Sequence, residues 1–107
     1  MQTTLKIVAN EDKLRAYLPR ELDHHAARPI REVLDRRLFE EKPTVLILDF
    51  SGVEVMDSSA IALIIGRASA CESLGAAVIL TGLSEHQKKL VRLSGALRTK
   101  NVSITEV

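Results

Sequence analysis

The sequence predicts a single α/β domain, in which helices pack on a mixed, mostly parallel sheet of about five strands. The chain has 107 residues, close to the commonest size of one domain, so we treat residues 1–107 as one unit. Apolar runs and helical patterns follow the order β-β-α-β-α-β-α-β, and strand-helix-strand units of this kind form right-handed crossovers in parallel sheets. Hydrophobic residues make up 46% of the chain, which is enough for a core without disulfides or metal.

The strands are predicted from short apolar runs. Residues 3–9 and 13–18 alternate in part, and the polar pair Glu11-Asp12 between them predicts a hairpin. Residues 44–50 contain Val45-Leu46-Ile47-Leu48 without alternation, which is typical of a strand covered on both faces. Two further strands are expected at residues 76–80 and 102–106.

The first helix is predicted from apolar residues at helical spacing, namely Ile30, Val33, Leu34 and Leu38. Proline is tolerated in the first turn of a helix but not in its interior. Pro29 therefore predicts a start near residues 26–28, and Asp23, His24 and His25 are expected in the loop before it.

The other two helices are predicted from their caps. Asp57-Ser58-Ser59 offers carboxylate and hydroxyl caps to a mostly apolar helix over residues 60–74. Gly66 within this helix predicts a close-packing position. The stretch Ser84-Glu85-His86-Gln87 forms a capping box for a helix through Leu93, which Gly95 stops.

Composition excludes several classes of function. Fifteen Lys and Arg against fourteen Asp and Glu give a net charge of +1, and aromatic residues make up 3% of the chain, so we expect no direct nucleic-acid binding. The lone Cys71 excludes an internal disulfide and a multi-cysteine zinc site, and fits a reducing compartment. The apolar runs are too short for membrane insertion, and we expect a cytoplasmic protein.

The segment Met56-Asp57-Ser58-Ser59-Ala60 is the main candidate site, because it brings two hydroxyls to the first turn of a helix. Such a turn has unpaired N–H groups and a partial positive charge. In one interpretation, Asp57 or Ser58 merely caps the helix. In the other, a serine here is phosphorylated, which adds roughly 1.5 to 2 negative charges to the surface.

Other chemistries have weaker support. His24 and His25 could bind zinc with Asp23 and Glu21, but no second ligand cluster has metal-site spacing, so we expect no metal. Ser58 does not lie in the Gly-x-Ser-x-Gly turn of a hydrolase, and the glycines are scattered rather than gathered in a phosphate-binding loop. We therefore expect neither catalysis nor a cofactor.

Three segments carry a resemblance to a known family: Glu21-Leu22-Asp23-His24-His25, Val55-Met56-Asp57-Ser58-Ser59 and Leu93-Ser94-Gly95. Together they resemble the STAS domain of bacterial anti-sigma-factor antagonists, in the sporulation-antagonist-like single-domain branch. The resemblance covers nearly the whole chain. This sequence departs from the family pattern at Arg20, Ala60 and Ala62, where glycine is the usual residue.

The resemblance implies a partner switch. The unphosphorylated antagonist would bind an anti-sigma factor that is also a serine kinase, phosphorylation of Ser58 would end this binding, and a PP2C-type serine phosphatase would restore it. The implied partner-binding residues are Asp23, His24, His25, Asp57, Ser58, Ser59 and Ala60. The alternative is a small STAS subunit of a larger signalling scaffold or lipid-transport complex, without control of a sigma factor.

Overall fold

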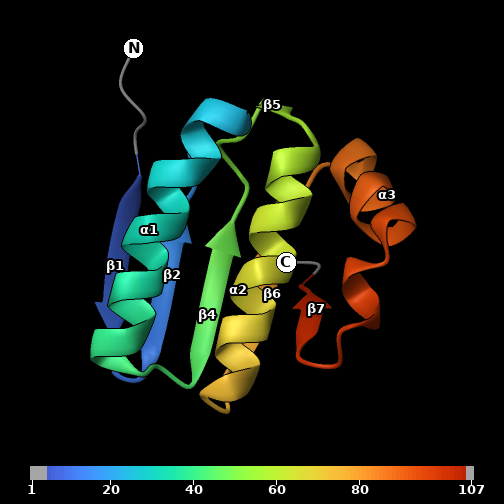
Figure 1. Ribbon diagram of the computed structural model, residues 1–107. Helices are drawn as coiled ribbons and strands as arrows, with labels where there is room; N and C mark the ends of the chain where they lie inside the picture. Colours follow the sequence, from blue (N-terminus) through green and yellow to red (C-terminus); the bar gives the residue numbers. More distant parts are fainter. Residues whose placement is uncertain (1–4, 106–107) are drawn as a thin grey trace.

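A five-stranded sheet in the order β1-β2-β4-β6-β7 forms the centre of the computed structural model, which describes residues 5–105 (Figure 1). β1 is antiparallel to β2, and the other neighbours are parallel. The predicted fold class and element order are thus confirmed; residues 3, 4 and 106 of the predicted strands lie outside the described part. The strands are β1 (Lys6–Asn10), β2 (Lys13–Tyr17), β4 (Val45–Asp49), β6 (Ala77–Thr81) and β7 (Val102–Ile104).

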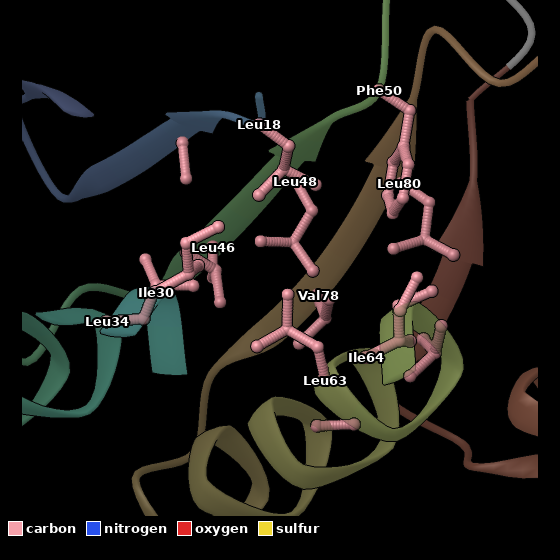
Figure 2. Packing of buried hydrophobic residues seen from close by; sticks show 14 of the residues in the cluster. Leu18, Ile30, Leu34, Leu46, Leu48, Phe50, Leu63, Ile64, Val78 and Leu80 are labelled. Atoms are coloured by element: carbon pink, nitrogen blue, oxygen red, sulfur yellow. The ribbon is translucent and has the colours of Figure 1, made fainter. Parts of the chain in front are cut away.

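The two long helices lie side by side on one face of this sheet, and the third helix lies at the β7 end of it (Figure 1). Leucines and isoleucines of the long helices meet Leu46, Leu48, Val78 and Leu80 of the central strands (Figure 2). The core therefore occupies the space between the sheet and these two helices. The helices are α1 (His24–Glu41), α2 (Ser58–Ser73), α3 (Glu85–Ser94) and a short 3₁₀ turn, η1 (Ala96–Arg98).

The prediction that residues 44–50 are covered on both faces was wrong. Leu46 and Leu48 are fully buried, but Val45 and Ile47 point to the opposite face and remain partly exposed. Ile47 pairs with Ile79 of β6, so apolar neighbours on this face shield each other. An unalternating apolar run can thus arise from a half-covered sheet.

The predicted start of the first helix was also wrong. α1 begins at His24, and Pro29 is its sixth residue. Asp23 is the N-cap, and its carboxylate accepts a hydrogen bond from the Ala26 N–H at 3.0 Å. The proline removes one backbone donor, but this cap and the buried apolar stripe from Ala26 to Leu38 hold the first turn in place.

Two features of the loops and helices differ from expectation. A second, two-stranded parallel sheet joins β3 (Glu21–Leu22) to β5 (Val55–Met56), and strands of two residues give no periodic signal. Gly66 is not a close-packing position, because a Cβ built there meets no atom within 4 Å. The cap predictions for α3 are confirmed, with a capping box at Ser84 and a left-handed Gly95 after its end.

Candidate partner-binding site

The amino ends of the helices gather at one edge of the molecule. The parallel strands β2, β4 and β6 point toward that edge, and the chain returns from it through α1, α2 and α3 (Figure 1). Each helix start carries a partial positive charge from its unpaired N–H groups. This edge therefore combines exposed loops with an electrostatic preference for anions.

Asp57 caps α2 and leaves Ser58 free. The Asp57 carboxylate accepts a hydrogen bond from the Ser59 N–H at 2.8 Å. Ser58 is the first helical residue and is exposed, and its hydroxyl makes no hydrogen bond to any residue from 5 to 105. The question of which residue caps the helix is thus answered by geometry: the carboxylate does so, and the serine hydroxyl is available for another role.

The loop before Ser58 is fixed from two sides. The Arg20 carbonyl accepts hydrogen bonds from the N–H groups of Glu54 and Val55, at 2.8 and 3.0 Å. On the other side, Gln87 of α3 donates from Nε2 to the Val53 carbonyl at 3.0 Å. Arg20 does not adopt a positive φ, so this departure from the family's glycine causes no backbone strain.

Gly82 and Asp49 fix the point where the chain leaves β4. A Cβ on Gly82 would lie 2.6 Å from the Ser51 nitrogen, and the φ of Gly82 is +75°, so only glycine fits there.

The Ser51 N–H donates to Asp49 Oδ1 at 2.8 Å, and Arg15 Nη2 lies 2.6 Å from Asp49 Oδ2. Burial alone would raise the pKa of Asp49, but the hydrogen bonds from Ser51 and Arg15 outweigh it and hold the pKa below its ordinary value.

The structure brings the start of α1 to the start of α2. His24 and Ser59 line the same groove between the two helices, and both histidine side chains at the start of α1 are exposed. The His24 and His25 rings lie edge to face, with centroids 5.8 Å apart. Ala60, by contrast, is fully buried, so its side chain supports the turn from inside and adds nothing to the surface.

Sequence reasoning missed two arginines of this groove. Arg28 and Arg31 line it together with His24, and the three residues are spaced by four and three positions on α1. That spacing places them on one face of a helix. The row of His24, Arg28 and Arg31 was therefore present in the sequence. The predicted helix start near residues 26–28 placed His24 outside the helix, so the row was not recognised.

The structure offers few groups for other chemistry. Within residues 5–105, no three His, Cys, Asp or Glu side chains lie close enough together to hold a metal ion. Cys71 is buried, and burial raises the pKa of its thiol to about 11. None of the helices in the described range is both long and apolar enough to cross a bilayer.

The fold and this site define a small α/β module with an exposed serine at a helix start. The chain belongs to the STAS domain family, whose model matches residues 6–106. A curated relative, the anti-sigma F factor antagonist of Lysinibacillus sphaericus, is 35% identical over 75 residues. That match covers 70% of this chain and 64% of the relative's length.

Solved structures of similar proteins agree with the fold. The anti-sigma factor antagonist SpoIIAA in its unphosphorylated form matches with a TM-score of 0.79 at 24% identity, over 97% of this chain and 89% of SpoIIAA. The phosphorylated form of SpoIIAA, a Bacillus cell fate determinant, matches with a TM-score of 0.75 at 26% identity, over 95% and 91% of the two chains.

Proposed function

We propose that this chain is an anti-sigma-factor antagonist that is switched by phosphorylation of Ser58. In its unphosphorylated form it binds an anti-sigma factor that is also a serine kinase, and the modified form is released. The observation that carries this proposal is the free, exposed Ser58 hydroxyl beside an Asp57 that already caps α2.

The comparisons support this proposal. The curated relative is an anti-sigma F factor antagonist, and SpoIIAA exists in an unphosphorylated and a phosphorylated form. The same fold is therefore compatible with a modified and an unmodified state in a similar protein.

The helix start explains why the domain tolerates the modification. A phosphate dianion gains from the partial positive charge at the start of α2, although the carboxylate of the neighbouring Asp57 opposes part of that gain. The same dianion buried in an interface is costly unless the partner supplies positive charge. Phosphorylation of Ser58 thus acts on binding rather than on folding.

The remaining parts of the switch follow from this role. The partner surface includes Asp23, His24, His25, Asp57 and Ser59 around the serine. A PP2C-type serine phosphatase removes the phosphate, and the chain itself catalyses no reaction. We place the whole cycle in the cytoplasm, where the kinase has ATP.

Phosphate transfer to one serine is the test. The purified chain is incubated with ATP and the anti-sigma kinase of its source organism, and intact-protein mass spectrometry counts the added phosphates. We expect one phosphate on the wild type and on Ser59→Ala, and none on Ser58→Ala. A phosphate that persists on Ser58→Ala overturns the assignment of the site, and an unmodified wild type that does not bind the kinase favours the scaffold-subunit alternative.

A further inference from the structure

A groove of about 340 Å³ runs between α1 and α2, next to the first turn of α2. Ser59 belongs to its wall, so the groove begins one residue from Ser58. The lining residues are His24, Ala27, Arg28 and Arg31 from α1, and Ser59, Ala62 and Leu63 from α2. The groove is therefore continuous with the surface that carries the switch.

The groove has more positive charge than its surroundings neutralise. Arg28 and Arg31 are exposed and make no ion pair or side-chain hydrogen bond within residues 5–105. Arg15 and Arg20, by contrast, are each paired with a carboxylate, of Asp49 and of Glu54.

A third arginine, Arg67, follows Leu63 by one helical turn on α2. Arg67 is buried, with 6% exposure; its Nε lies 2.8 Å from Asp35 Oδ1, and its Nη1 has no hydrogen-bond partner. Burial lowers the pKa of Arg67, and the nearby charge of Arg31 lowers it further while Asp35 raises it. The Asp35 carboxylate is thus already engaged by Arg67, and the charge of Arg31 lies close to the same pair.

Apolar side chains form another part of the lining. Leu63 is buried and Ala27 is half-buried. Ala62, on the second turn of α2, exposes its methyl group. Guanidinium groups bind carboxylates through paired hydrogen bonds, and apolar side chains pack against aliphatic ones. A peptide with a carboxylate next to an aliphatic residue therefore fits this lining. A bare phosphate would use the positive charge but would leave the side chains of Ala62 and Leu63 without a contact.

We propose that this groove receives an acidic segment of the kinase partner, with an Asp or Glu carboxylate held by Arg28 and Arg31 and an aliphatic side chain against Ala62 and Leu63. The proposal rests on the proposed function for the identity of the partner. It also explains why phosphorylation of Ser58 would weaken binding rather than strengthen it. A dianion on Ser58, beside the groove, repels an acidic segment and competes with it for the same positive charge.

Charge reversal tests the groove. Arg28→Glu and Arg31→Glu are compared with Arg36→Glu, an exposed arginine of the same helix that has no ion pair in the described part of the chain. Isothermal titration against the kinase, at 50 and 300 mM salt, measures affinity, and circular dichroism confirms that each variant is folded. We expect the two groove variants to bind about tenfold or more weakly, and Arg36→Glu to bind within about twofold of the wild type. The salt dependence should be weaker for the groove variants.

A second variant keeps the test decisive if a reversal unfolds the domain. Ala62→Phe fills the groove from an exposed position of α2, and Ser69→Phe is its control on an exposed position of the same helix. We expect only Ala62→Phe to lose affinity by about tenfold. If the wild type binds the kinase and is phosphorylated on Ser58, yet the folded groove variants bind as their controls do, the groove proposal is wrong and the proposed function stands. If the wild type itself neither binds nor is modified, the proposed function fails first.

Discussion

Replacing Gln87 by alanine tests whether α3 holds the loop that leads to Ser58, the proposed switch residue. Gln87 is buried, with 6% exposure, although it is polar. Its Nε2 donates to the Val53 carbonyl at 3.0 Å, and its Oε1 accepts from the Ser84 N–H at 2.9 Å. One side chain therefore closes the capping box of α3 and fastens the loop that leads to Ser58.

The cost of Gln87→Ala follows from the groups that it leaves behind. The Val53 carbonyl accepts its bond in a buried setting, and a buried group without a partner costs about 1–3 kcal/mol. Ser84 is exposed, so water replaces part of the second bond and its loss costs about 0.5–1.5 kcal/mol. The sum is about 1.5–4.5 kcal/mol, which lowers the urea midpoint by roughly 1–2 M for an m-value of about 2 kcal/mol/M.

Urea unfolding followed by circular dichroism measures this effect. His86→Ala is the control, because His86 is exposed on the same turn of α3. Gln87→Met retains the volume and isolates the loss of the hydrogen bonds. We expect Gln87→Ala also to slow phosphorylation of Ser58, since the loop is less well held. A change in the free energy of unfolding of less than about 0.5 kcal/mol, equal to that of His86→Ala, would refute the reasoning.

Three further predictions concern the switch, a turn and an ion pair. Ser58→Asp should change the melting temperature by no more than about 2 °C, yet weaken kinase binding by about tenfold; scanning calorimetry and titration check both. Gly82→Ala should cost about 2–4 kcal/mol, because its Cβ meets Ser51, whereas Gly75→Ala, with a similar positive φ in open space, should cost about 1–2 kcal/mol; equal costs would contradict the role of the contact. Since the folded pKa of Asp49 lies below its ordinary value, its stabilising effect is present at neutral pH and is lost as pH falls below about 4. Asp49→Asn should therefore be less stable at pH 7 and show a shallower decline in acid, as urea unfolding at several pH values will reveal.

Much of the fold follows from the sequence because the elements are long and their caps are strong. The hairpin at residues 6–17, the capping box at Ser84 and the stop at Gly95 each depend on neighbouring residues alone. Two of the errors arose where tertiary contacts decide the outcome. The coverage of Ile47 depends on whether a helix lies on the second face of the sheet, and Pro29 is tolerated because Asp23 and the buried stripe of α1 hold the turn before it.

The candidate site could be located from the sequence but not resolved in detail. The Asp57-Ser58-Ser59 motif predicted a helix start with hydroxyls, and the structure shows that helix start. Which side chain caps the helix depends on the direction in which each one points, and residue types do not determine that. Arg28 and Arg31 could not be assigned to the site, because their part in it comes from the packing of α1 against α2.

The geometry separates the proposed charge switch at Ser58 from the stability of the domain. Asp57 performs the structural work of the helix start, Gln87 and Arg20 hold the loop, and Ser58 takes part in neither task. A phosphate on a side chain that the fold does not use changes the surface while the core contacts persist. The free energy of partner binding can then change by the full electrostatic difference between the phosphorylated and unphosphorylated interface. No part of that difference is offset by unfolding or refolding of the module. A switch serine that also capped its helix would lack this independence.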